Sequence, residues 1–99
     1  MRLGKVVGKV TLNRADASYR GGRWLIVSPL DREQYAGGGQ DRLSAHYSSI
    51  VYDNLGAGEG DIIGFVEGAE ATAPFPHPMP IDAINAAIIE RLNYQPPQT

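Results

Sequence analysis

The chain has 99 residues, a formal net charge of −2 at pH 7 and no cysteine. This length suits one domain with a modest core, and the lack of cysteine excludes disulfides, thiolate metal sites and cysteine nucleophiles. The slight acidity disfavours binding to nucleic acid or to an anionic membrane. No apolar run approaches the ~18 residues of a membrane span, and the first residues lack the apolar core of a signal peptide. We therefore expect a soluble cytoplasmic protein with no nucleic-acid or membrane partner.

Two strands are predicted in the first third of the chain. Alternating apolar and polar residues predict the first over 3–12, and its glycines indicate a strongly bent strand. Residues 13–22 are polar and end in two glycines, which predicts a loop. The second strand is predicted over 23–28 and stops at Pro29. Its Trp24 is interpreted as a partly buried packing residue, with an interface anchor as the alternative.

The middle of the chain predicts two further strands. Residues 29–42 contain three consecutive glycines and several charges, so we expect a flexible connection. A third strand is predicted over 43–54, and its polar first half, 44–49, indicates a sheet edge or a subunit contact. The fourth is predicted over 61–67, and residues 69–73 are a candidate for a further short strand.

The last third predicts a stiff connector followed by a helix. Residues 74–80 carry four prolines at alternate positions, which impose an extended path. We interpret this segment as a connector, and the alternative is a proline-rich recognition motif. The helical spacing of Ile81, Ile84, Ile88 and Leu92 predicts a helix over about 81–93. A polar tail, residues 94–99, is expected to be flexible.

These elements together predict a mainly β protein. Four or five short strands, glycine-rich turns and one C-terminal helix favour a small OB-like β-barrel. The predicted domain covers residues 1–93 as a single unit.

A glycine-rich turn joins the third and fourth predicted strands. Its glycines stand at every second position, between two acids, and the predicted structural residues are Asp53, Gly56, Gly58, Gly60 and Asp61. A dinucleotide fingerprint needs a different spacing and a following helix, and a P-loop needs Gly-Lys-Ser/Thr, so a phosphate-binding loop is disfavoured. Wherever φ is positive, a β-branched replacement should destabilise the turn, and Gly58→Val is expected to lower the melting temperature or block assembly.

No constellation of catalytic residues is recognisable. The two histidines, His46 and His77, lie in unlike contexts without metal-binding spacing. Serines flank His46, but neither a nucleophile elbow nor a third orienting group accompanies them. The remaining candidate is acid–base chemistry by a carboxylate pair at the glycine turn, although turn-capping aspartates are much commoner. We therefore predict no enzyme, no catalytic residue, no cofactor and no metal.

Four blocks of the chain stand out in order. They are the opening Met1-x-Leu3-Gly4-Lys5-Val6-Val7-Gly8-x-Val10, then Leu25-Ile26-Val27-x-Pro29-Leu30-Asp31, the turn Asp53-x-Leu55-Gly56-Ala57-Gly58-x-Gly60-Asp61, and Pro80-Ile81-Asp82-Ala83. Together they resemble the EutN/CcmL family of bacterial microcompartment vertex proteins, and the turn is similar to that family's D-x-V-G-A-G-x-G-[DE] signature. The run Ala69-Glu70-Ala71-Thr72 departs from the family's Ser-Ser-Ala-Arg-like run.

The resemblance implies a shell protein that forms homopentamers of OB-like barrels. These would cap the five-fold vertices of a carboxysome-like or metabolosome-like shell in the cytoplasm, beside hexameric and pseudohexameric shell proteins. We expect the shell contacts in exposed loops, with Arg14, Asp16, Arg20 and Arg32 as candidates. The alternative function is an OB-fold module that binds single-stranded nucleic acid, which would need a basic groove with exposed aromatic residues.

Overall fold

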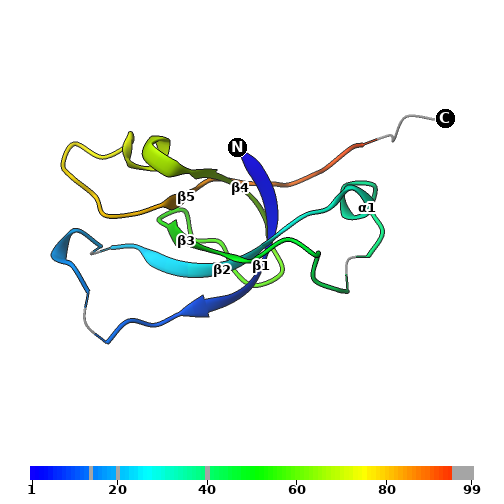
Figure 1. Ribbon diagram of the computed structural model, residues 1–99, viewed down its shortest axis with the longest axis horizontal. Helices are drawn as coiled ribbons and strands as arrows, with labels where there is room; N and C mark the ends of the chain where they lie inside the picture. The colour runs from blue at the N-terminus through cyan, green and yellow to red at the C-terminus, as the bar shows by residue number, and fades with distance from the viewer. Residues whose placement is uncertain (14, 20, 40, 95–99) are drawn as a thin grey trace.

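A computed structural model describes residues 1–13, 15–19, 21–39 and 41–94, and Figure 1 shows its elongated β-barrel. Its elements in chain order are β1 (Arg2–Val10), η1 (Ala17–Tyr19), β2 (Arg23–Pro29), α1 (Arg32–Tyr35), β3 (Ser49–Asp53), β4 (Ile62–Glu67), η2 (Gly68–Thr72) and β5 (Ala83–Ile88).

The five strands close into one barrel. Their order around it is β1-β2-β3-β5-β4, and β4 pairs with β1 to complete the circle. All pairings are antiparallel except that between β3 and β5. A small five-stranded barrel with this mixture of strand directions is OB-like, so the predicted mainly β fold is confirmed.

The predicted C-terminal helix is wrong, because residues 83–88 form β5. This strand pairs with β4 from Glu67↔Ala83 to Ile63↔Ile88. Ala83 and Asn85 point into the barrel, while Ile84 packs outside it against Tyr52 and Met79. Without β5, both β3 and β4 would present open edges, and their pairing outweighs the helical propensity of the alanines.

Three further expectations are corrected in the connections. Residues 69–73 do not add a strand, because Gly68–Thr72 form the 3₁₀ helix η2. The third strand begins at Ser49, so residues 43–48 precede it as irregular chain. The segment predicted as flexible, 29–42, contains α1, and buried Gln34 donates to the carbonyl oxygens of Gly39 and Arg42 at 2.9 Å each.

Two apolar clusters lie on either side of the barrel wall. Inside it, Phe65, Ile63, Val27 and Val51 have no exposed surface. Outside it, at one end of the barrel, a second cluster is built around Tyr52, Ala71, Met79 and Ile84. The chain therefore supplements a small barrel interior with a second core under the 68–82 connection.

The seam between β3 and β5 is the weakest pairing of the barrel. The strands β3 and β5 are parallel and pair at one position, Tyr52↔Ile84, whereas β2 and β3 pair over five positions. A hydrogen bond from Asn85 to buried Asp53 (2.9 Å) adds to this seam.

Candidate interaction surface

The carboxylate of Asp53 organises the glycine turn from inside the protein. One oxygen accepts hydrogen bonds from the backbone N–H of Leu55 (3.0 Å) and the side chain of Asn85 (2.9 Å). The other accepts from the N–H groups of Gly56 (3.1 Å) and Ala57 (3.0 Å). Asp53 is 1% exposed, and an Arg23 nitrogen lies 3.8 Å from it. With its acceptor sites occupied in this way, the carboxylate serves as a structural cap.

The glycines of the turn have unequal backbone conformations. Gly56 and Gly60 have φ values of +90° and +92°, which side chains rarely tolerate. Gly58 has no positive φ, and a Cβ added there would meet open space. The reason given for a destabilising effect of Gly58→Val, a positive φ, is therefore absent at Gly58. It is present at Gly56 and Gly60. Asp61 accepts from the N–H of Gly58 at 2.8 Å, so both acids cap the turn.

Asn85 is a structural residue that the sequence pattern did not identify. It is 2% exposed, donates to Asp53 and accepts from the N–H of Ala87 at 3.1 Å. The β4–β5 register shifts at this point, between Gly64 and Phe65. The available signal was one amide side chain in an otherwise apolar run, which the helical interpretation placed outside the core.

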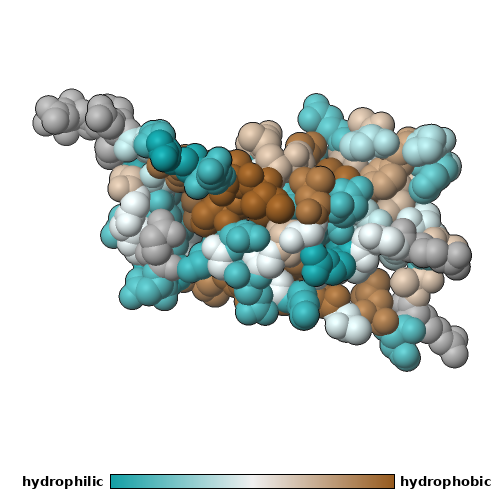
Figure 2. All heavy atoms as spheres, turned by 180° about the vertical axis from the view of Figure 1, so that it is seen from behind, coloured by the Kyte–Doolittle hydropathy of each residue, from teal (hydrophilic) through white to brown (hydrophobic). Residues whose placement is uncertain are grey.

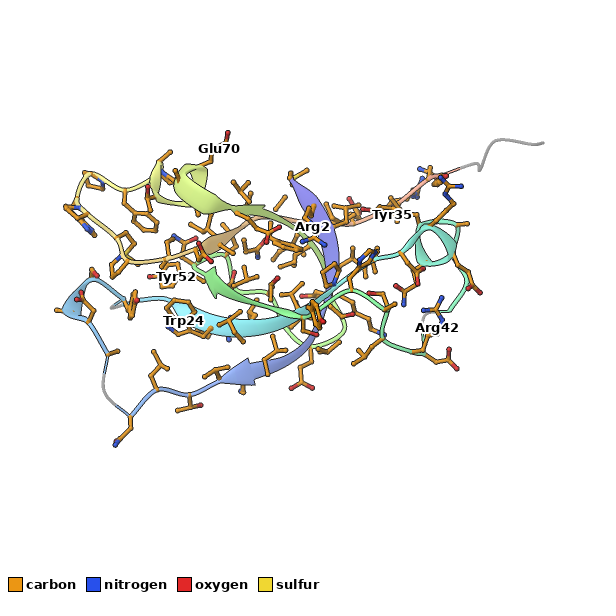
Figure 3. All side chains as sticks on the ribbon, viewed as in Figure 1. Arg2, Trp24, Tyr35, Arg42, Tyr52 and Glu70 are labelled. Atoms are coloured by element: carbon orange, nitrogen blue, oxygen red, sulfur yellow. The ribbon has the colours of Figure 1, made fainter. Side chains whose placement is uncertain are left out.

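A chain of aromatic rings lies over the second core, where Figure 3 labels Trp24 and Tyr52 side by side. Tyr52 has Trp24 at 5.4 Å on one side and Phe75 at 5.9 Å on the other, measured between ring centroids. Trp24 is half-buried, as predicted for a packing residue. Burial raises the pKa of Tyr52. Because these rings pack on each other, they do not form the open stacking platform of a single-stranded nucleic-acid site.

The aromatic chain also anchors two loops. The Tyr19 hydroxyl donates to the carbonyl oxygen of Pro80, and the Tyr52 hydroxyl donates to the carbonyl oxygen of Tyr19 at 3.4 Å. A Cβ on Gly22 would lie 2.0 Å from the Tyr52 ring, so this position requires glycine for close approach. The proline-rich connector 74–80 is thereby fixed to the β1–β2 loop.

At the other end of the barrel, charges hold α1. Asp31 caps the helix by accepting from the N–H of Gln34 at 2.9 Å, and Arg42 contacts Asp31 and Glu33 at 2.8 Å each. The hydrogen bond from Arg42, followed by that from Gln34, lowers the pKa of Asp31. The same ion pairs raise the pKa of Arg42.

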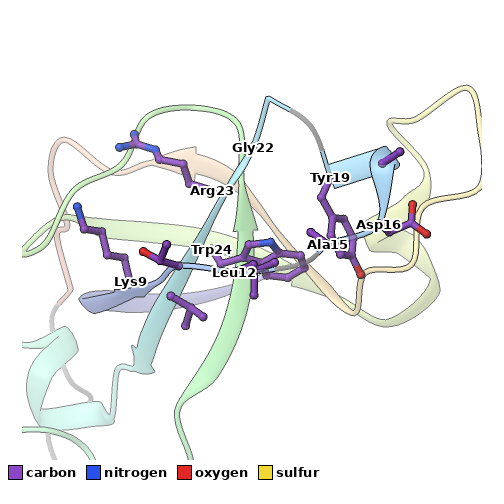
Figure 4. A pocket seen from close by; sticks show the side chains of 11 residues that line it. Lys9, Leu12, Ala15, Asp16, Tyr19, Gly22, Arg23 and Trp24 are labelled. Carbon is purple, nitrogen blue, oxygen red and sulfur yellow. The ribbon is translucent and has the colours of Figure 1, made fainter.

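The structure describes two of the four loop residues that were candidates for shell contacts. Asp16 is exposed, and its carboxylate accepts hydrogen bonds from the hydroxyl of Ser18 and from the N–H of Ser18 at 2.9 Å. The hydroxyl, followed by the N–H, lowers the pKa of Asp16. It lines a cavity of about 510 Å³ beside Trp24 and Tyr19 (Figure 4). Arg32 is exposed at the start of α1, at the opposite end of the molecule (Figure 1). Arg14 and Arg20 lie outside the described residues.

The histidine and serine candidates do not assemble into a catalytic group. The hydroxyl of Ser44 donates to the Pro29 carbonyl oxygen and accepts from the N–H of His46 at 3.2 Å. His77 packs against Phe75, with ring centroids 5.9 Å apart. Among the described residues, no three histidine or acidic side chains could together hold a metal ion. Within the same part of the chain, no helix is both long and apolar enough to cross a bilayer.

Two parts of the outer wall of the barrel are apolar where a solvated barrel would be polar. On β2 and β3, Ile26 and Ile50 pair across the outer face, and Ile50 is 47% exposed. On β4 and β5, Gly64 pairs with Ala87 beneath Met1, which is 76% exposed. Figure 2 shows apolar side chains gathered around β4 and β5 on the face seen from behind. Antiparallel sheets in water normally alternate apolar and polar faces, so these walls are suited to burial against other subunits.

Residues 1–90 match the protein family described as ethanolamine utilisation protein EutN/carboxysome. No curated protein to which the chain was compared is significantly similar.

Several solved structures share the fold. The pentameric microcompartment shell protein GrpN from Rhodospirillum rubrum is 26% identical, with a TM-score of 0.74 over 96% of this chain and 100% of that one. CcmL from Nostoc sp. PCC 7120 is 26% identical, with a TM-score of 0.71 over 93% and 92%. EutN from Escherichia coli is 22% identical, with a TM-score of 0.75 over 95% and 89%, and supports the fold alone.

Proposed function

This chain belongs to the EutN/carboxysome family, and from that membership we propose that it is a structural shell protein of a bacterial microcompartment. In this proposal it forms a cyclic homopentamer that closes a five-fold vertex of the shell. The observation that carries the proposal is the family match over residues 1–90, which includes every strand of the barrel. It is supported by the likeness to a pentameric shell protein that the chain covers from end to end.

The outer walls of the barrel give this proposal a physical basis. A closed ring of identical subunits places one patch of each copy against a different patch of the next. Ile26 and Ile50 on one wall, and Met1 above Gly64 and Ala87 on another, supply two separate apolar patches. Burying them between subunits would compensate for the modest core of a chain of 99 residues.

The proposed partners beyond the ring are hexameric and pseudohexameric shell proteins. A layer of hexagonal units cannot close on itself without pentagons, so a pentamer has a defined place at each corner. A contact made by one subunit is repeated five times around the ring, and after the first contact the others are effectively intramolecular. We propose the exposed loops for these contacts, with Asp16, Arg32 and the two candidates outside the described residues, Arg14 and Arg20.

The structural role also accounts for the chemistry of the turn. The carboxylate of Asp53 accepts four hydrogen bonds, and that of Asp61 accepts one from the N–H of Gly58. The two carboxylates therefore stabilise the turn through hydrogen bonds within the chain. A shell subunit of this kind performs its function through shape and contact surface. We propose no reaction for it.

The first test is the mass of the native protein. Native mass spectrometry at micromolar concentration should give five subunits, and a monomer would contradict the ring. The second test co-expresses hexameric shell proteins with and without this chain. Shells that lack it should be open or elongated, and the protein should be found only at five-fold positions. Shells that close equally well without it, or protein found inside the lumen, would contradict vertex capping.

A further inference from the structure

A cleft of about 360 Å³ opens on the outside of the barrel beside the seam between β3 and β5. We call it the seam cleft and define it by Trp24, Ile50, Glu67, Ile81 and Asp82, which line it together with neighbouring residues. It lies next to the pairing of Tyr52 with Ile84, on the side where Ile50 and Asp82 precede these residues along the chain.

The lining of the seam cleft is suited to a cationic side chain. Its apolar part includes the half-buried Trp24 and the 47% exposed Ile50, which can cover the aliphatic stem of a lysine. Its charged residues are two acids, Asp82 and Glu67. The carboxylate of Glu67 forms an ion pair with Arg2, with 3.0 Å between nitrogen and oxygen. Asp82 is exposed, and its backbone carbonyl oxygen accepts a hydrogen bond from the N–H of Gly68. The two carboxylates would repel an anion.

The matching cations are the lysines of β1. In the strand order β1-β2-β3-β5-β4, β1 is the strand farthest from the β3–β5 seam. The charged residues of β1, Arg2, Lys5 and Lys9, are all cationic, and Arg2 is paired with Glu67 of the same subunit, so the lysines are the cations considered for a contact between copies. Lys9 is exposed, whereas the half-buried Lys5 lines a groove with the apolar Val7 and Leu43. Asp41, Arg42 and Glu59 line the same groove. Each subunit therefore has an acidic cleft at the seam and a lysine-bearing apolar strand away from it.

We propose that, in the ring, the seam cleft of each copy receives a lysine side chain of β1 from the next copy. This inference rests on the proposed pentamer and identifies the two surfaces that meet. Opposite charges on two different surfaces favour head-to-tail contact and disfavour the two-fold contact that would place like surfaces together. The apolar residues around each lysine and around the cleft provide the buried area.

The test uses charge reversal at Asp82 and Lys9, which are exposed, and at the half-buried Lys5. The variants are Asp82→Lys in the cleft, Lys9→Glu and Lys5→Glu on β1, and Arg91→Glu after β5 as the matched control, because Arg91 is exposed and lines neither surface. Native mass spectrometry over a dilution series gives the concentration at which half of the protein is pentameric. Asp82→Lys and at least one lysine reversal should raise this concentration by about tenfold or more. Arg91→Glu should leave it unchanged.

The swap decides whether the two surfaces meet. A chain that carries Asp82→Lys together with the effective lysine reversal restores opposite charges across the contact, so assembly should recover toward the wild-type concentration. Failure of the swap to recover, or unchanged assembly of all the single variants, would overturn the pairing. Rings that persist while incorporation into shells fails would show that another shell protein occupies the cleft, which also overturns it. A wild-type protein that is monomeric would instead contradict the pentamer itself.

Discussion

At the scale of single residues, the glycine turn depends on two glycines for their backbone conformation and on one carboxylate for its hydrogen bonds. The sequence predicted that Asp53 and Asp61 cap this turn, because acids beside alternating glycines are typical caps. It could not distinguish Gly58 from its neighbours, since φ is set by how the turn returns to β1: the N–H of Gly60 donates to the carbonyl oxygen of Val6 at 2.8 Å.

Replacing Gly60 by valine should destabilise the protein by about 1–3 kcal/mol, because a β-branched side chain at φ +92° is strained. Gly58→Val is the matched control and should change the stability by no more than about 0.5 kcal/mol, since its Cβ meets open space. Urea unfolding of both variants at equal concentration measures the difference. Equal losses at the two positions would contradict this account of the turn.

Removing the Asp53 carboxylate should be far more harmful than removing that of Asp61. Asp53→Ala leaves three backbone N–H groups and the Asn85 amide without their acceptor in a buried site, so we expect a loss of at least about 3 kcal/mol. Asp61→Ala removes a cap to Gly58 that lies near the surface and should cost about 1 kcal/mol. Calorimetric melting of both variants checks the order.

At the scale of elements, the sequence predicted the first four strands but assigned the fifth to a helix. Ile81, Ile84, Ile88 and Leu92 do recur at helical spacing, and nothing local contradicts a helix. The strand is favoured by groups that are far away in the sequence. These are the open edges of β3 and β4 and the carboxylate of Asp53, which accepts a hydrogen bond from Asn85. The same limit applies to α1, because its anchor Gln34 bonds to carbonyl groups that only the folded loop brings near.

The capping charge at α1 predicts a specific pH dependence. The pKa of Asp31 is lower in the folded chain than its ordinary value, chiefly because Arg42 donates to the carboxylate. Its contribution to stability is therefore complete above the ordinary value of about 3.8 and is lost as the pH falls through the lower, folded value.

Asp31→Asn keeps a good helix cap but removes this charge, so it isolates the electrostatic part. The difference in unfolding midpoint between wild type and variant should be constant from pH 7 to about 5 and should shrink below about pH 4. Urea titrations across this range measure it, and carboxyl NMR shifts of Asp31 give the folded pKa directly. A difference that grows toward acid pH would contradict the sign.

At the scale of the whole molecule, the apolar outer walls link stability to assembly. A ligand that binds only the folded state raises the melting temperature in proportion to the logarithm of its concentration, and here the ligand is another copy of the chain. The melting temperature should therefore rise when the protein concentration is raised a hundredfold. Ile50→Asp places a charge on the apolar face beside Ile26 and should remove most of this dependence. A melting temperature independent of concentration in the wild type would contradict a dissociable ring.

The position of β5 between β3 and β4 has a consequence for biosynthesis. Residues 1–82 emerging from a ribosome can form an antiparallel arrangement of four strands, but that sheet has two open edges and lacks the amide partner of Asp53. The unpaired backbone groups at these two edges can form hydrogen bonds with a neighbouring nascent chain on the same mRNA. Only when residues 83–88 are translated and inserted do the edges disappear. Ring formation needs the closed barrel, so it follows the synthesis of β5, and until then the open edges of β3 and β4 expose neighbouring nascent chains on one polysome to mispairing.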